Sequence, residues 1–142
     1  MYNVAVTAIV INDDGQVLLT KRSMKKDKWP GKWTVPGGKV EDSDFLGLPT
    51  DINNQWYHTL ENAVKREVLE ETGYEITDIS YVCNIAVPGT IIVSYKAKLA
   101  GGSLKEQEGE VDAVAWVWES ELDGYDIIDG IKEEILEALR SA

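Results

Sequence analysis

The chain has 142 residues, of which 44% are hydrophobic and 27% are charged, and this composition predicts one globular domain over residues 1–142. Its formal net charge of −11 argues against a polymeric nucleic-acid partner, because that binding depends on lysine and arginine neutralising phosphates. The sequence has neither an apolar run of about eighteen residues nor a charged-then-apolar leader, so we expect no membrane span, no secretory signal and a cytoplasmic location.

The first residues predict a β-hairpin. Residues 2–11 are rich in valine, alanine and isoleucine, residues 12–15 read Asn-Asp-Asp-Gly, and residues 16–22 alternate again. Asparagine, aspartate and glycine are the residues that tight turns favour, so the two apolar runs are expected to pair.

A polar, basic segment over residues 21–32 follows, and it is expected to be a loop that leads into a short strand at 32–35. Its lysines, Lys25, Lys26 and Lys28, are interpreted either as solvated surface charges or as contacts to a phosphate group. The residue types do not decide between these two interpretations.

The segment 42–57 has apolar residues among Gly, Pro, Asp and Asn, without a sustained period. A loop of this length indicates a lid, a binding loop or a disordered segment. Trp56 and Tyr57 could stack on a nucleobase, since every base has a π-face, or they could anchor the loop to the core.

A helix is predicted from Thr59, the expected N-cap, to Gly73, the expected stop. Glu67, Glu70 and Glu71 stand at i, i+3 and i+4, so they fall within about a quarter turn of the helix and border its apolar side. Clustered carboxylates resist burial unless a cation compensates them, and hard divalent cations such as Mg²⁺ take oxygen ligands. The helix is therefore interpreted as a metal-binding platform.

The second half of the chain predicts further strands and a last helix. Residues 74–87, 90–99 and 111–118 are apolar and β-branched, with a glycine-rich acidic loop at 100–109, and residues 126–139 carry isoleucine and leucine at helical spacing. Strands and helices in this order favour a mixed sheet between helices, an α/β/α sandwich.

The stretch 66–74, Arg-Glu-Val-Leu-Glu-Glu-Thr-Gly-Tyr, resembles the second half of the Nudix hydrolase signature. That signature runs Gly, five residues, Glu, seven residues, then Arg-Glu-apolar-any-Glu-Glu-any-Gly-apolar. Upstream, residues 31–41, Gly-Lys-Trp-Thr-Val-Pro-Gly-Gly-Lys-Val-Glu, resemble the strand and Gly-Gly turn that precede the metal helix in that family. The resemblance implies the same α/β/α sandwich.

One part of the signature differs here. Gly38 and Arg66 are 28 positions apart, the difference of their numbers, whereas the family spacing is half as long. We therefore interpret residues 42–57 as a loop inserted within the signature. Counting back from Arg66 places His58 where the first signature glutamate stands. Either His58 replaces that residue, or a carboxylate of the longer loop does so; the candidates are Glu41, Asp42 and Asp44.

The resemblance implies a Mg²⁺ site, with Mn²⁺ as a substitute. Glu67, Glu70 and Glu71 would hold the ion, and the main-chain carbonyl of Gly37 or Gly38 would add an oxygen ligand. The implied reaction is attack of water on a phosphorus of a diphosphate joined to a nucleoside.

Arg66 would act on the site through Glu70, because it stands four residues before that acid and could hold its rotamer. The general base is expected to be Glu67 or Glu70 of the helix, or a glutamate of the later loop, where Glu110 is preferred to Glu108. These alternatives stay open at the level of sequence.

Substrate contacts are expected from Arg22, Lys39, Trp56 and Tyr57. The resemblance implies a MutT-like nucleoside triphosphate pyrophosphatase or an ADP-ribose pyrophosphatase, acting on a small nucleotide as a homodimer. The alternative is a catalytically weak Nudix-fold module that binds a nucleotide as a sensor. A plain acidic surface helix of an interaction protein would leave the Pro-Gly-Gly turn and the helix pattern unexplained.

Overall fold

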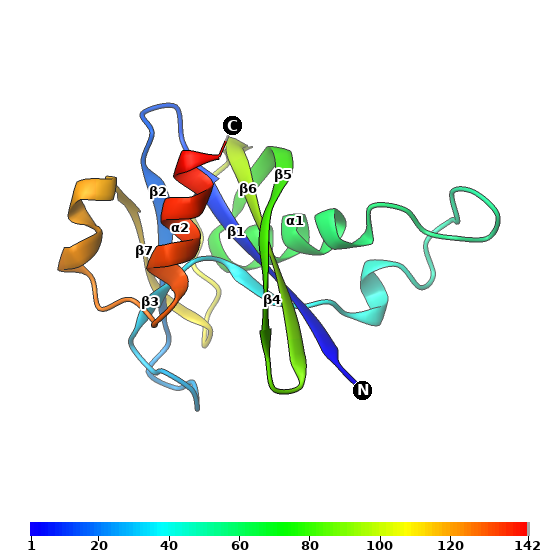
Figure 1. Ribbon diagram of the computed structural model, residues 1–142, viewed down its shortest axis with the longest axis horizontal. Helices are drawn as coiled ribbons and strands as arrows, with labels where there is room; N and C mark the ends of the chain where they lie inside the picture. Colours follow the sequence, from blue (N-terminus) through cyan, green and yellow to red (C-terminus); the bar gives the residue numbers. More distant parts are fainter. Residues whose placement is uncertain (142) are drawn as a thin grey trace.

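One mixed sheet of seven strands organises the computed structural model, which describes residues 1–141 (Figure 1). The strands are β1 (Asn3–Ile11), β2 (Val17–Arg22), β3 (Trp33–Thr34), β4 (Gly37–Lys39), β5 (Tyr74–Val87), β6 (Thr90–Gly102) and β7 (Val111–Val117). The helices are α1 (Thr59–Thr72) and α2 (Ile131–Arg140), and the shorter 3₁₀ turns are η1 (Asp42–Asp44) and η2 (Glu119–Gly124).

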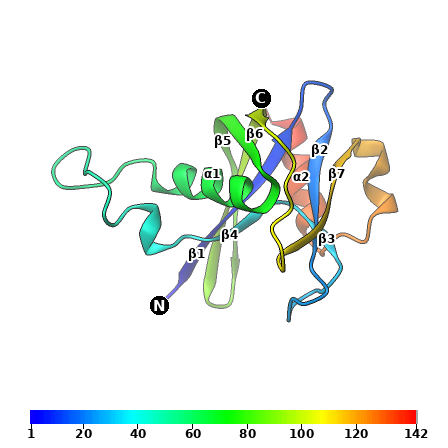
Figure 2. The same ribbon diagram turned by 180° about the vertical axis from the view of Figure 1, so that it is seen from behind.

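The two helices cover opposite faces of the sheet. Helix α2 lies in front of the strands in Figure 1, and α1 lies in front of them when the molecule is turned by 180° in Figure 2. The predicted α/β/α sandwich is confirmed. Within residues 1–141, neither helix is long and apolar enough to cross a membrane.

Alternation along the central strands divides the core between the two faces. On β1, Val6, Ala8 and Val10 pack with the buried side of α1, whereas Ile9 packs with the buried side of α2. Successive side chains of a strand point to opposite faces, so one strand supplies both halves of the core. Both cores together hold the sheet in a fixed position relative to the two helices.

The predicted amino-terminal hairpin is only partly right. Its turn forms, with Gly15 at φ 89, but the two strands pair only at Ile11 and Val17. Beyond this point β1 pairs in parallel with β6 along its whole length, and β2 pairs with β7 instead. A local turn signal predicted the reversal of the chain, and long-range pairing chose the partners.

Three further predictions need correction. The last helix begins at Ile131 and not at 126, because the backbone of Asp126 and Ile128 bonds to Trp33 and places this segment beside β3. The N-cap of α1 is His58, with φ 59 and no side-chain cap bond, and not Thr59. The expected Gly-Gly turn is the short strand β4, which pairs with β1. The predicted stop of α1 at Gly73, with φ 78, is confirmed.

Residues 45–58, here called the arm, extend away from the sheet beyond the amino-terminal end of α1 (Figure 1). The arm has its own packing: the rings of Phe45 and Trp56 lie 5.4 Å apart, and the Trp56 indole N–H donates to the carbonyl oxygen of Leu48 at 3.0 Å. Asn53 and Asn54, both with positive φ, form its tip. Trp56 therefore anchors the arm to itself and not to the core.

Candidate functional site

Close packing between β4 and its neighbours explains both glycines of the Pro-Gly-Gly segment. A Cβ atom on Gly38 would stand 2.5 Å from Oε1 of Glu67, and one on Gly37 would stand 2.4 Å from the carbonyl oxygen of Val6. Real Cβ atoms do not approach other atoms so closely, so only glycine lets β4 lie between β1 and α1. The Glu67 side chain, in a residue only 8% exposed, packs directly against this strand.

Glu71, one turn further along α1, lies among other carboxylates. Burial, followed by the charges of Glu67 and Glu110, raises the pKa of Glu71 well above its usual value. The backbone N–H of Gly37 donates to this carboxylate and lowers its pKa, by less than Glu67 raises it but by more than Glu110 does, and the attraction of the Lys26 ammonium group is the smallest effect. Carboxylates of α1 and of the loop before β7 therefore meet around one partly buried acid.

Arg66 links this cluster to η1. Its Nε and Nη2 atoms donate to the two carboxylate oxygens of Asp44, at 2.6 and 3.1 Å. Its Nη1 atom donates to Glu67 at 3.0 Å and to Glu70 at 3.1 Å. The bidentate contact with Asp44 fixes the guanidinium plane, because Nε and Nη2 must both meet oxygens of the same carboxylate. The predicted pairing of Arg66 with Glu70 is present, and Glu67 shares it.

Asp44 is the residue that sequence reasoning left undecided. Its side chain is only 2% exposed. Burial alone would raise the pKa of Asp44, but the Arg66 guanidinium group and the backbone N–H of Glu41 outweigh burial and lower the pKa below its usual value. Asp44 is therefore held as a carboxylate. The His58 side chain is 76% exposed and contacts Glu61 at 3.3 Å, away from Arg66.

The forward count along the signature would have found this residue. Five residues separate Gly38 from Asp44, which is the family spacing from glycine to the first glutamate, with aspartate in its place. The count back from Arg66 gave His58 because it crossed the extra residues. Those extra residues are the arm, 45–58. The inserted segment therefore begins after Asp44 and ends at residue 58, whereas the sequence predicted 42–57.

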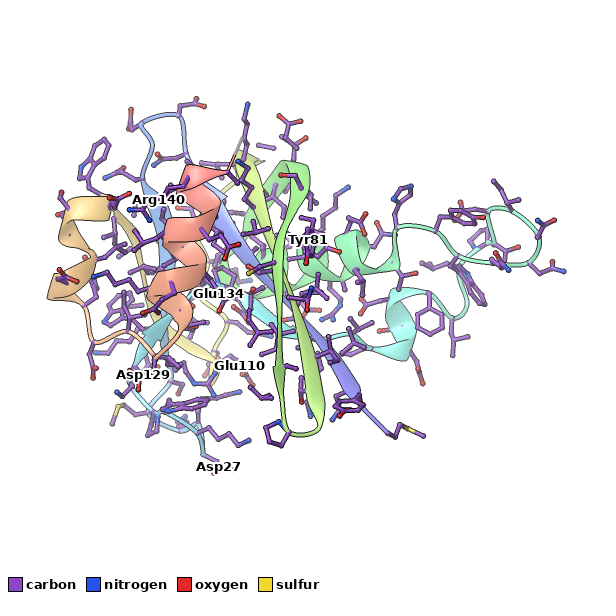
Figure 3. All side chains as sticks on the ribbon, viewed as in Figure 1. Asp27, Tyr81, Glu110, Asp129, Glu134 and Arg140 are labelled. Carbon is purple, nitrogen blue, oxygen red and sulfur yellow. The ribbon has the colours of Figure 1, made fainter. Side chains whose placement is uncertain are left out.

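Glu70 and Glu110 stand at the open side of the cluster. Their side chains are 45% and 47% exposed, and Glu110 forms an ion pair with Lys26. Of the two loop glutamates considered as a base, Glu110 is the one whose charge acts on Glu71. Figure 3 labels Glu110 together with Asp27 of the basic loop.

The four expected substrate contacts do not gather in one place. The Nε atom of Arg22 donates to the carbonyl oxygen of Lys28 at 2.9 Å, inside the β2–β3 loop. The Lys39 side chain is exposed, and the carbonyl oxygen of this residue accepts from Arg66. Trp56 and Tyr57 belong to the arm, where with Asp44 they line a cavity of about 250 Å³.

The donor set fits a hard divalent cation. Within residues 1–141, no three His, Cys, Asp or Glu side chains are already arranged as a complete ligand set, and Arg66 holds two of the expected ligands. Glu71 is nevertheless a partly buried carboxylate whose strongest charged neighbours are carboxylates. Oxygen donors with uncompensated negative charge are what Mg²⁺ and Mn²⁺ bind, and a cation there would favour the ionised form of Glu71.

Comparison with known proteins identifies the family of this chain. A family model, the NUDIX domain, matches residues 1–139. Among solved structures, MutT from Aliivibrio salmonicida or Vibrio cholerae is similar with a TM-score of 0.71 and 23% identity, over 98% of each chain. The NUDIX domain of NrtR from Shewanella oneidensis, solved with ADP ribose, has a TM-score of 0.74 and 21% identity over 97% of this chain and 86% of that one.

The curated relatives carry the name of a different enzyme. The isopentenyl-diphosphate Delta-isomerase of Salmonella paratyphi B is 36% identical over 80 residues, which are 56% of this chain and 37% of that protein. The matched segment thus covers well under two thirds of that relative. At these identities the similar solved structures support the fold alone.

Proposed function

The chain belongs to the Nudix family, and we propose that it is a Mg²⁺-dependent hydrolase that cleaves the pyrophosphate bond of a nucleoside diphosphate linked to another group. One observation carries the proposal: Glu71 is partly buried, and its strongest charged neighbours, Glu67 and Glu110, are also acids. An arrangement that costs stability in the free protein is explained if a cation completes it.

Each residue of the cluster has a role in this proposal. Glu67, Glu70 and Glu71 hold the ion, with the main-chain oxygen of Gly37 or Gly38 beside them. When bound, Mg²⁺ supplies charge neutralisation at the phosphate oxygens and a more acidic water. Arg66 is a positioning residue, since it contacts Glu67 and Glu70 and is itself held by Asp44.

The general base is proposed among the acids that have room for a water molecule. Glu110 is half-exposed at the rim of the cluster, whereas Glu67 is buried against Gly38. A base needs hydrogen-bond access to the attacking water, which favours Glu110, with Glu70 as the helix candidate.

The proposed substrates are a nucleoside triphosphate, as for MutT-like enzymes, or ADP-ribose. ADP ribose is the ligand named for one similar structure, and another is an ADP-ribose pyrophosphatase of Streptococcus suis with a TM-score of 0.70. The curated relative is named for isopentenyl diphosphate, which carries no nucleoside. What these compounds share is a diphosphate group, and this is the part of the substrate that the cluster would recognise.

A second candidate is a nucleotide-binding module with weak catalysis. The observation that favours it is the double contact of Arg66, which already neutralises Glu67 and Glu70. A cation would have to share both carboxylates with the guanidinium group, and this would weaken its binding.

A substrate panel tests the proposal. The purified chain is incubated with Mg²⁺ and canonical and oxidised nucleoside triphosphates, ADP-ribose, nucleotide sugars, dinucleoside polyphosphates and isopentenyl diphosphate, and released phosphate is read after phosphatase coupling. We expect turnover of one nucleotide class, lost in Glu70→Gln and Glu71→Gln. Glu61→Gln, on the same helix but outside the cluster, is the matched control and should keep full activity.

The outcomes separate the two candidates. Nucleotide binding without turnover would move the binding module to first place, and turnover unchanged by Glu71→Gln would refute the metal-platform argument. The homodimer and the cytoplasmic location stay predictions, which size measurement in solution and cell fractionation would test.

A further inference from the structure

One cation reaches the carboxylate cluster from outside α1. Lys26, in the β2–β3 loop, forms an ion pair with Glu110 across 84 positions of the sequence, and its side chain is 30% exposed. It also attracts the partly buried carboxylate of Glu71. Lys26 is therefore the lysine whose charge acts directly on two acids of the proposed metal site.

The backbone around Lys26 holds it in this place. The N–H of Ser23 donates to the carbonyl oxygen of Glu110 at 2.9 Å, and the N–H of Lys26 donates to the carbonyl oxygen of Ser23 at 3.1 Å. The N–H of Met24 donates to Asp112 Oδ2 at 3.1 Å. The β2–β3 loop is thus tied to the segment that carries Glu110, so the contact is part of the folded framework.

A divalent cation and the Lys26 ammonium group compete for the same negative charge. Lys26 partly compensates Glu110 and Glu71, whereas a bound metal would place a double charge among the same oxygens, and two cations at one cluster repel each other. This repulsion favours movement of the ammonium group away from Glu110 when the metal binds.

We propose that Lys26 is a built-in counter-cation of the metal site, which compensates Glu110 and Glu71 in the metal-free protein and must be displaced from Glu110 when a divalent cation binds. This inference rests on the proposed function, because it presupposes that the cluster binds a metal. It assigns Lys26 a positioning role: the residue keeps the empty cluster stable and sets the metal concentration at which the site fills.

Two effects of opposite sign follow when Lys26 is replaced by methionine, which keeps an apolar stem of similar length. The metal-free protein should be less stable, since acids at the cluster lose a partner. Metal binding should become tighter, since the Lys26 ammonium group no longer competes and Arg66 is the same in both proteins. A lysine with a merely structural role would not produce the second effect, because its loss would disturb the site and weaken binding.

The test is calorimetric titration of Mn²⁺ and, separately, Mg²⁺ into the full chain, with thermal unfolding followed in EDTA. For Lys26→Met we expect Mn²⁺ to bind about tenfold more tightly than in the wild type, a factor that corresponds to about 1.4 kcal/mol. We also expect a lower midpoint of unfolding in EDTA and recovery of that midpoint in saturating Mn²⁺.

Two matched variants test whether Lys26 affects metal affinity through its place beside Glu110 or only through the net charge of the protein. Lys25→Met removes the same charge from the same loop at an exposed side chain, and its affinity should stay within about twofold of the wild type, because screening weakens distant exposed charges. Lys26→Arg keeps a cation and should bind Mn²⁺ like the wild type. Equal tightening in both methionine variants would overturn the proposal, as would unchanged or weaker binding in Lys26→Met.

Glu71→Gln distinguishes this inference from the proposed function. If the wild type binds Mn²⁺, Glu71→Gln abolishes binding and Lys26→Met changes nothing, the metal site stands and only the counter-cation is refuted. If the wild type binds no divalent cation, both the metal-dependent function and the role of Lys26 are refuted.

Discussion

The two faces of the sheet each bury a glutamate, and they treat its charge differently. Glu134 on α2, labelled in Figure 3, is 8% exposed and accepts a hydrogen bond from the Thr7 hydroxyl at 3.1 Å. Glu67 on α1 is equally buried but accepts its hydrogen bond from the Arg66 guanidinium group. In both residues burial is the main cause that raises the pKa. Both donors favour the carboxylate form, but Arg66 also adds a positive charge, whereas the Thr7 hydroxyl adds none.

This difference indicates which face is built to carry charge. On the α1 side, Arg66 and Lys26 face a group of acids. On the α2 side, the charged neighbours that act on Glu134 are Glu133 and Glu137, which disfavour its ionisation. The same physical cost, burial of a carboxyl group, is thus offset by cations on the α1 face and by a neutral hydroxyl donor, Thr7, on the α2 face.

Replacing Arg66 by methionine should have the largest effect. Asp44, 2% exposed, would lose the cation that keeps it ionised, and we expect the free energy of unfolding to fall by about 3 kcal/mol. Urea denaturation in EDTA measures the change. Lys65→Met, at the exposed neighbouring position, should leave stability within about 0.5 kcal/mol of the wild type.

The Arg66 prediction has a built-in check. Asp44→Asn added to Arg66→Met should restore part of the lost stability, since a neutral amide leaves no unpaired charge. If the single Arg66 variant were as stable as the wild type, the α1 face would tolerate an uncompensated acid, and the contrast with the α2 face would disappear.

Gly38→Ala should have an intermediate effect on stability and a strong one on the site. The new Cβ would stand 2.5 Å from the Glu67 carboxylate, so the acid or β4 must shift, at a cost of about 2 kcal/mol. A displacement of about 1 Å at a reacting centre lowers turnover roughly a hundredfold. Urea denaturation and kcat at saturating Mg²⁺ measure the two effects.

Gly124→Ala is the matched control, because a Cβ atom there would meet no atom within 4 Å. Full activity in Gly38→Ala would show that the position of Glu67 does not matter, which would remove Glu67 from the proposed ligands.

Glu134→Gln should have the smallest effect, and its sign is opposite. The folded protein raises the pKa of Glu134 above its usual value of 4.5, so the folded state binds a proton more tightly than the unfolded state does. Wild-type stability should therefore fall as pH rises from 4.5 through the folded pKa, and the variant should lack this loss. At pH 7 we expect Glu134→Gln to be more stable than the wild type, because the amide avoids the burial of a charge.

Denaturation curves at several pH values between 4 and 8 would test this, with the exposed Glu133→Gln as the control. A less stable Gln variant at pH 7 would mean that Glu134 is ionised and stabilising, and the two faces would then be alike. Metal binding should not change in Glu134→Gln, since α2 lies on the far face.

Local patterns predicted what lies close together in the sequence. The spacing of Glu67, Glu70 and Glu71 placed three acids on one side of α1, and Gly73 marked where the helix ends. The arm, by contrast, lies between Gly38 and Arg66, so counting back from Arg66 selected His58. Asp44, which binds Arg66, was therefore only one of several alternatives. Counting forward from Gly38 would have selected it.

By itself, the sequence determined the sandwich, the acid-bearing helix and the end of that helix at Gly73, because turn residues and the helical period act over a few residues. Only the tertiary structure decided which groups complete the site. Asp44 reaches Arg66 across 22 positions, and Lys26 reaches Glu110 across 84. Such contacts depend on how distant strands pair and on which face a loop closes over, and no local period encodes either.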